Sequence, residues 1–143
     1  MNNIELEYAL SNNAFTRKYF TGVFPACQRP AKRRIYSFVT NTDCHTQPGK
    51  HWCAWFVRYN HVLFFDSFGR SPYDKTLPGD YRKFVKMFRT YDFVKIPVQN
   101  PDSVFCGQHC MHFLLVMSLG LSVSDFLKDY EYYSVLQITN SVF

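Results

Sequence analysis

The most informative stretch of this sequence is Gln99-Asn-Pro-Asp-Ser-Val-Phe-Cys106-Gly-Gln-His-Cys110-Met-His-Phe-Leu-Leu-Val-Met-Ser-Leu119. After the turn signal Asn100-Pro101-Asp102, apolar residues recur at a period of about 3.6, which predicts a helix that begins near Cys106. The helix is apolar on nearly every face, so we expect it to be buried at the centre of the domain. Its first residue is a cysteine.

Cys106 lies where a helix stabilises an anion. The unpaired backbone N–H groups and the positive end of the helix dipole favour thiolate over thiol at this position. Gly107 would let a substrate backbone approach without a Cβ in the way. Gln99, seven residues upstream across a Pro-containing loop, could return an amide donor to the same point. The stretch therefore predicts half of an active site.

Length and composition predict one domain that covers residues 1–143. The chain is 47% hydrophobic and 19% aromatic, which is ample material for a single core. It has no apolar run of about 18 residues and no basic-then-apolar leader, so we expect a soluble, non-secreted protein without membrane contact. The net charge of +5 permits contact with nucleic acid. The local basic residues are Lys32-Arg33-Arg34, Arg82, Lys83, Lys86 and Arg89.

The five cysteines predict reduced thiols. Their number is odd and no export signal precedes them, which disfavours a disulfide framework. We expect the cysteines other than Cys106 to be core fillers or bystanders; they are Cys27, Cys44, Cys53 and Cys110.

The remaining patterns predict an α+β fold with a mixed sheet around the central helix. The expected elements are a helix over 4–10, an extended loop over 20–25, a strand over 35–39, a loop over 41–50, strands over 52–59 and 62–66, a helix over 81–91 capped by Asp80, a strand over 93–98 and a helix from Ser122 to about 133. The tail after it fits no single pattern.

The two central strands bring a histidine and a carboxylate together. If the hairpin turns at Tyr59-Asn60, Asp66 faces Cys53 and lies diagonally from His51, roughly 7–8 Å away between Cα atoms. His51 would then act as base and acid for Cys106, and Asp66 would orient the imidazole.

Each of these residues has an ordinary structural reading when it is taken alone. Cys106 could be a core cysteine, His51 a loop histidine, Asp66 a strand-end cap and Gln99 a solvated loop amide. Trp52 could belong to the core or clamp a substrate. Their combination favours a thiol active site in which Gln99 stabilises the oxyanion.

A metal site is the competing reading of the helix start. Four candidate ligands fall within seven residues there: Cys106, His109, Cys110 and His112. Residue 112 does not share a helix face with the other three, and no zinc-finger or HExxH spacing occurs. We therefore predict that no metal is bound.

The order and spacing of the motifs resemble a known family. His51-Trp52 at a strand start, Asp66-Ser-Phe-Gly after the next strand, and Gln99 before Cys106-Gly107 resemble the adenovirus-type cysteine proteases, called adenain. The segment Phe20-Thr-Gly-Val-Phe-Pro25 is similar to the N-terminal motif of related proteases in Maverick-type transposons. The SUMO-specific and ubiquitin-like proteases share this fold and chemistry.

The resemblance implies a function. It implies a nucleophile helix packed on a sheet that carries His51 and Asp66, a clamp at Trp52, and cleavage of viral or element-encoded structural precursors at sites that contain glycine. The implied protein is a monomer found in the virion and in the host nucleus or cytoplasm. The rival predictions are an isopeptidase for ubiquitin-like modifiers, with the same chemistry, and a non-catalytic DNA-binding virion component.

The resemblance does not decide whether this protein needs an activator. The sequence itself requires no cofactor, but adenain-type enzymes are activated by DNA and by a peptide that is disulfide-linked to a cysteine between the acidic residue and the glutamine. Residues 67–105 contain no cysteine, so peptide activation in that form is not expected here.

Overall fold

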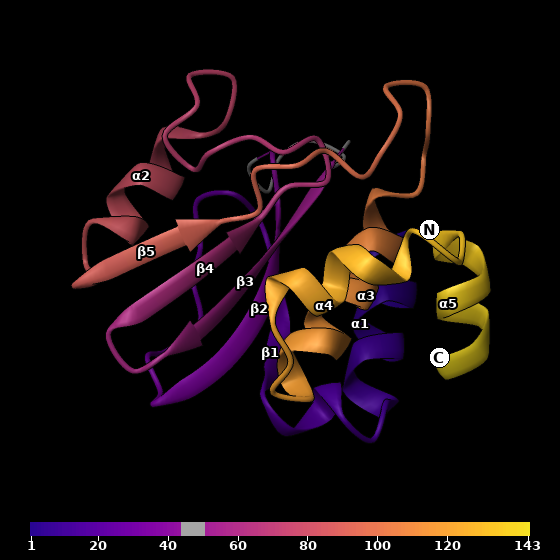
Figure 1. Ribbon diagram of the computed structural model, residues 1–143. Coiled ribbons are helices and arrows are strands. Elements are labelled where there is room, and N and C mark those ends of the chain that lie inside the picture. The colour runs from indigo at the N-terminus through magenta and orange to yellow at the C-terminus, as the bar shows by residue number, and fades with distance from the viewer. Residues whose placement is uncertain (44–50) are drawn as a thin grey trace.

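The computed structural model describes residues 1–43 and 51–143 and contains one mixed β-sheet with helices on both faces (Figure 1). The sheet order is β1-β2-β3-β4-β5. The two outer pairs are parallel and the two inner pairs antiparallel, so the predicted α+β fold with a mixed sheet is confirmed. The strands are β1 (Phe20–Phe24), β2 (Ile35–Asn41), β3 (Trp52–Arg58), β4 (His61–Phe65) and β5 (Thr90–Phe93).

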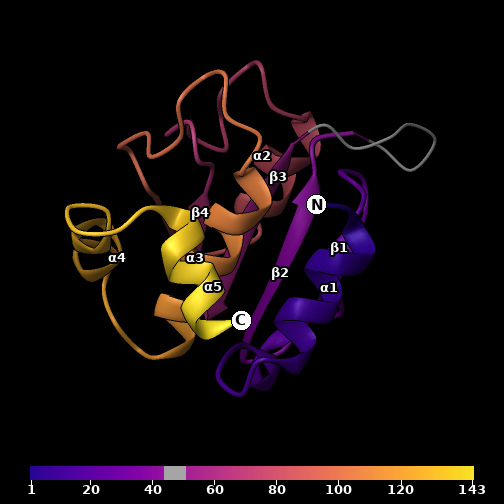
Figure 2. The same ribbon diagram turned by 90° about the vertical axis from the view of Figure 1, so that its right-hand side faces the viewer.

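The helices divide between the two faces of the sheet (Figures 1 and 2). On one face α3 packs against β3, and α1, α4 and α5 pack around α3; α2 lies at the other end of the molecule, on the opposite face. The helices are α1 (Asn3–Asn12), α2 (Gly79–Val85), α3 (Cys106–Ser118), α4 (Val123–Asp129) and α5 (Val135–Val142), with a short 3-10 turn at Thr16–Lys18.

Strand β3 is buried on both sides because each face of the sheet has its own core. Alternate residues point to opposite faces of a strand. Ala54 and Phe56 join the core under α3, whereas Trp55 and Val57 join the core under α2. The all-round apolar pattern of the central helix has the same cause, since α3 is enclosed by the sheet and the other helices.

The hairpin forms as predicted. Strands β3 and β4 pair antiparallel in a register that runs from Arg58 opposite His61 to Ala54 opposite Phe65. Tyr59 adopts the left-handed conformation at the turn, with φ of 56°. The next step of this register places Asp66 beyond the end of β4, beside residues 51–53.

The segment over 20–25 differs from its prediction, because residues 20–24 form a strand instead of a loop. Strand β1 pairs parallel with β2, and the register shifts between Phe20 and Val23. Gly22 lies in that shift with φ of 144°, a conformation that other residues rarely adopt. The glycine that suggested a loop is therefore part of a β-bulge.

The elements between residues 79 and 98 are also shifted from their prediction. Helix α2 ends at Val85 rather than residue 91, and its N-cap is Pro78 rather than Asp80. The strand predicted over 93–98 lies at Thr90–Phe93, where it pairs with β4. Tertiary pairing captures the β-prone residues that helical periodicity had assigned to the helix.

The C-terminal region contains two short capped helices. Ser122 caps α4 as predicted, and Asp125 completes a capping box, but the helix ends at Asp129. Ser134 and Gln137 form a second capping box that starts α5, in the tail for which no element was predicted.

The thiol prediction is wrong for Cys27, which is disulfide-bonded. Among the described residues, Cys53, Cys106 and Cys110 are free and buried. Cys44 and most of the loop predicted over 41–50 lie outside the described residues. None of the helices formed by residues 1–43 and 51–143 has the length and apolar character of a membrane span.

Candidate active site

Cys106 is the first residue of α3, and its side chain lines a surface cleft. Burial alone would raise the pKa of its thiol. The hydrogen bond with His51, backbone hydrogen bonds at Trp52 and Gly107, and the nearby imidazole charge outweigh burial and lower the pKa below its ordinary value. These contacts shift the thiol of Cys106 toward the thiolate.

His51 precedes β3 and connects the thiol to a carboxylate. Its Nε2 atom lies 2.5 Å from Asp66 Oδ1, and its ring stacks on Phe68 with centroids 5.0 Å apart. Burial lowers the pKa of His51, but the hydrogen bonds to Asp66 and Cys106 and their negative charges raise it to about 9. Because Nε2 is engaged by Asp66, Nδ1 is the nitrogen left to exchange a proton with Cys106.

The two shifts describe one ion pair. The pKa of Cys106 falls below its ordinary value while that of His51 rises above its own, because each charged form stabilises the other. Both shifts favour an imidazolium beside a thiolate over the neutral pair.

Asp66 is fully buried just after β4, and a second cation holds it. Arg70 Nε lies 2.7 Å from Asp66 Oδ2, and Arg70 Nη2 lies 3.3 Å from Oδ1. The Arg70 backbone N–H also donates to Oδ2 at 3.2 Å. Burial raises the pKa of Asp66, but the hydrogen bonds from His51 and Arg70 and their positive charges lower it below its ordinary value.

Arg70 is the residue that sequence reasoning missed. It follows Asp66 by four positions across the turn at Gly69, whose N–H donates to Asp66 O at 2.8 Å. The sequence signal that could have identified it is a cation four residues after the carboxylate, with a glycine between them that permits a tight turn. Gly69 has φ of 78° and lies so close to residues 95–97 that a Cβ would approach Pro97 N to 2.9 Å. The turn thus brings Asp66 and the segment before Gln99 together.

Gln99 is buried at the rim of the same cleft. The N–H groups of Val98 and Gln99 donate to Ser67 O at 2.9 and 3.1 Å. The Ser67 hydroxyl donates to Gln99 Oε1, and Gln99 Nε2 donates to Ser103 O at 2.7 Å. Because the carboxamide oxygen accepts from Ser67, its orientation is fixed and one Nε2 hydrogen is left over.

The cleft joins the predicted residues in one hollow of about 500 Å3. His51, Trp52, Gln99 and Cys106 all line it, together with Arg70. Asp66 lies behind His51 as its buried partner. Four of the six predicted residues therefore line one cavity.

Trp52 and Gly107 pack against each other beside the thiol. Trp52 is 7% exposed, and its Nε1 donates to Asn3 Oδ1 at 2.8 Å. A Cβ at Gly107 would lie 2.9 Å from Met1 Sδ and 3.3 Å from Trp52 Cε3. Glycine at 107 therefore lets the indole approach the first turn of α3.

The candidate metal ligands are engaged otherwise. His51, Cys53 and Asp66 place ligand atoms within 4.8 Å of one another, but Asp66 already accepts from His51 and Arg70. Burial raises the pKa of the Cys53 thiol well above its ordinary value, which keeps it protonated. These residues do not fit a divalent cation, because a guanidinium and a thiol occupy the positions where it would need anions.

The cysteine and histidine cluster on α3 is also directed elsewhere. His109 Nδ1 lies 2.7 Å from the Tyr130 hydroxyl, and His112 Nε2 lies 2.8 Å from Asp129 Oδ2. The Cys110 thiol donates to Trp52 O at 3.4 Å. These side chains fix α4 and β3 against the central helix.

Comparison with known proteins finds likenesses among solved structures but no sequence relative. No protein-family model matches the chain, and no curated protein matches it. Among solved structures, the crystal structure of the ASFV pS273R protease aligns at 24% identity with a TM-score of 0.49. The alignment covers 68% of this chain and 39% of that protease, so the chain spans well under half of its length. The function is therefore argued from the site itself.

Proposed function

We propose that this chain is a cysteine endopeptidase of a virus or virus-like element that processes structural precursor proteins. The observation that supports it most directly is the Cys106–His51–Asp66 relay in one cleft, in which the thiol pKa is lowered and the imidazole pKa is raised to about 9. A structural cysteine packed in a core would have a raised pKa, as Cys53 and Cys110 do.

The proposed reaction begins with the ion pair. The Cys106 thiolate attacks the scissile carbonyl carbon and forms a C–S bond, while the carbonyl π electrons move to oxygen. The Cys106 backbone N–H and the second Nε2 hydrogen of Gln99 donate to this oxyanion. As the C–N bond breaks, His51 Nδ1 gives its proton to the leaving amine, and an acyl-enzyme remains.

Hydrolysis of the acyl-enzyme uses the same residues in reverse. His51, now neutral, takes a proton from water, whose oxygen attacks the thioester carbonyl, and the thiolate departs. Asp66 stabilises the imidazolium at each stage, and Arg70 keeps Asp66 ionised. Trp52 narrows the cleft beside Gly107, which favours small residues such as glycine at the scissile bond.

The test is cleavage of a panel of glycine-containing peptides by the wild-type chain and by Cys106→Ala and Cys110→Ala. We expect cleavage that Cys106→Ala abolishes and that the matched Cys110→Ala variant retains. Cleavage that survives in Cys106→Ala would refute the assignment of the nucleophile.

A Gly-Gly-tailed modifier protein assayed beside the peptides separates the two substrate classes. An endopeptidase cleaves the short peptides, whereas an isopeptidase requires the folded modifier. A kcat/KM that is higher for the modifier by about 100-fold or more would favour the isopeptidase.

A further inference from the structure

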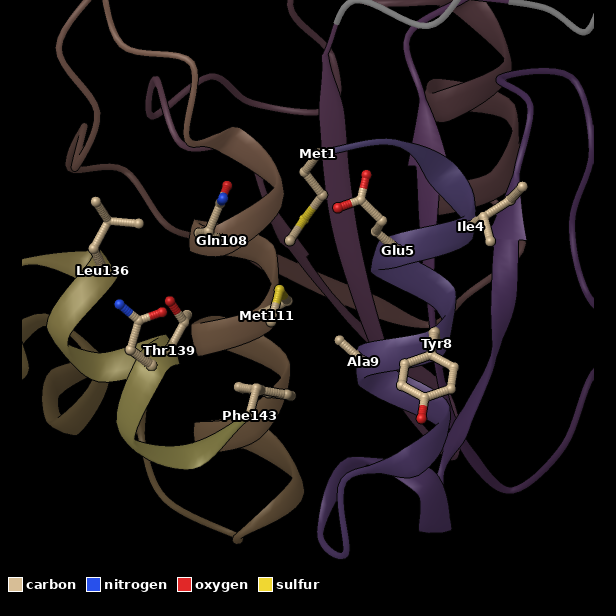
Figure 3. A pocket seen from close by; sticks show the side chains of 11 residues that line it. Met1, Ile4, Glu5, Tyr8, Ala9, Gln108, Met111, Leu136, Thr139 and Phe143 are labelled. Carbon is tan, nitrogen blue, oxygen red and sulfur yellow. The ribbon is translucent and has the colours of Figure 1, made fainter.

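A second hollow opens where α1, α3 and α5 meet (Figure 3). Its volume is about 540 Å3, which lies within the usual range of ligand sites. Side chains from α1 face side chains from α3 and α5 across it. Its apolar lining includes Met1, Ile4, Ala9, Met111, Leu136 and Phe143.

This helical hollow borders the catalytic cleft. Met1 lines both cavities, and its Sδ atom packs where a Cβ of Gly107 would lie. Helix α3 contributes Gln108 and Met111 to the lining of the helical hollow, and these residues follow Cys106 by two and five positions. At 1.5 Å of rise per residue they lie about 3 and 7.5 Å further along the helix axis. An extended peptide therefore needs at least about one residue to reach Gln108 and at least about two to reach Met111.

Gln108 offers an unused acceptor in the helical hollow. Its Oε1 atom is buried and has no hydrogen-bond partner among the described residues. Buried acceptors nearly always have a donor, since leaving one unpaired costs about 1–3 kcal/mol. Gln108 is among the side chains that line the hollow from α3 (Figure 3). A backbone N–H of a peptide lying in the hollow would satisfy it.

The residues that line the hollow also indicate which kind of substrate side chain it would accept. Ile4 and Tyr8 are exposed at 79% and 70%, an apolar surface that gains from being covered. Glu5 is the acidic side chain among the residues that line it, and it would repel a substrate carboxylate. The helical hollow thus favours an apolar residue and disfavours an acidic one.

The groove on the other side of α5 is also lined by apolar side chains, but it does not border the catalytic cleft. That groove is lined by His112, Leu115 and Ile138, and no residue lines both it and the catalytic cleft. It therefore supplies a matched control surface on the same helix.

We propose that the helical hollow is a specificity subsite of the catalytic cleft. It takes an apolar side chain of the polypeptide substrate, two or three residues from the scissile bond, while Gln108 Oε1 accepts a substrate backbone N–H. This inference rests on the proposed function and adds the residues that select the substrate.

The experiment profiles cleavage of a glycine-centred peptide library in which each position within four residues of the scissile bond carries Leu, Met, Phe, Asp or Lys. The wild-type chain is expected to prefer an apolar residue over Asp by about tenfold or more at one position two or three residues from the bond. Leu136→Lys, which places a cation in the helical hollow, is expected to reduce that ratio to below about threefold by admitting Asp.

Two further variants complete the experiment. Ile138→Lys, on the far side of α5, is expected to keep the wild-type profile. Gln108→Leu is expected to raise KM for all peptides by roughly 5-fold or more without changing the order of preference. A general loss of stability would instead alter Leu136→Lys and Ile138→Lys alike.

The possible outcomes distinguish a failure of the subsite proposal from a failure of the proposed protease function. Cys106-dependent cleavage with the same profile in wild type and Leu136→Lys would overturn the subsite alone. Cleavage without an apolar preference at those positions would overturn it as well. A library in which no peptide is cleaved in a Cys106-dependent manner would overturn the proposed function, and the subsite with it.

Discussion

Residues 1–43 and 51–143 contain two imidazole–carboxylate pairs, and their environments shift the two histidine pKa values in opposite directions. His51 lies 2.5 Å from Asp66 and has a raised pKa, whereas His112 lies 2.8 Å from Asp129 and has a lowered one. Burial lowers the pKa in both cases, so the carboxylate and its surroundings account for the difference.

The two carboxylates differ in solvent exposure and in their other partners. Asp66 is fully buried, and Arg70 keeps it ionised. Asp129 is 44% exposed, so water screens its charge. His51 also contacts a second potential anion, Cys106, whereas His112 packs between the rings of Phe126 and Tyr130. The His51–Asp66 pair thus differs from the His112–Asp129 pair in three ways. Its carboxylate is buried, a cation holds that carboxylate, and its imidazole contacts a thiol.

The largest expected effect comes from removing each imidazole. His51→Ala should lower kcat/KM on a cleaved peptide by about 1,000-fold or more, because the thiolate loses its partner. His112→Ala should keep kcat/KM per folded molecule within about threefold and lower the free energy of unfolding by about 2 kcal/mol, since it empties a fully buried site. Peptide kinetics and urea unfolding measure both. Equal losses of activity in the two variants would break the comparison.

Replacing the two carboxylates should affect kcat/KM almost as differently as removing the two imidazoles. Asp66→Asn leaves the shape intact but removes the charge that stabilises the imidazolium, so kcat/KM should fall by about 100- to 1,000-fold. Asp129→Asn should change kcat/KM by less than about twofold, because its side chain is half-exposed, contacts His112 and does not line the catalytic cleft. Steady-state kinetics on one peptide tests the pair, and a large effect of Asp129→Asn would contradict the account.

The pH dependence of stability should show the two histidine environments separately. Burial lowers the pKa of His109 to about 4 and also lowers that of His112. Below the unfolded pKa of about 6.5 the unfolded state binds more protons, so the free energy of unfolding should fall by about 2 kcal/mol between pH 7 and 5. His51 acts oppositely: its stabilisation is fully present below about 6.5 and is lost as pH rises through about 9.

The free energy of unfolding is measured by urea titration on both the acid and the alkaline side of neutral pH, for the wild type, His109→Phe and His51→Ala. We expect the acid loss to shrink in His109→Phe and the alkaline loss to shrink in His51→Ala. An acid limb unchanged in His109→Phe would assign the acid sensitivity to other groups.

The smallest expected effect concerns Arg70. Arg70→Met removes the guanidinium that lowers the pKa of Asp66, so that pKa should rise. Asp66 must be ionised to act, and the acid limb of the kcat/KM profile should therefore move to higher pH, with a loss of about tenfold near neutral pH. A parallel drop at every pH, without a shift of the limb, would give Arg70 a purely structural role.

The sequence predicts the parts of this molecule that depend on local pattern. The start of α3 at Cys106 and the hairpin that brings His51 to Asp66 follow from periodicity and turn chemistry. The bulge at Gly22 and the strand at Thr90–Phe93 depend on pairing with distant strands, so local rules misassign them. Arg70 was missed for a different reason: its spacing of four residues from Asp66 is local, but the turn at Gly69 that brings its guanidinium back to the carboxylate was not anticipated.

The central claim is that His51 holds Cys106 as a thiolate, and the pH dependence of Cys106 alkylation by iodoacetamide tests it most directly. Mass spectrometry reads each thiol separately, so Cys53 and Cys110, whose pKa values burial raises, are internal controls. We predict that Cys106 in the wild type reacts at near its maximal rate already at neutral pH, and that His51→Ala moves this rise to alkaline pH. A rate that rises only near the ordinary thiol pKa of about 8.5 and does not depend on His51 would contradict the account.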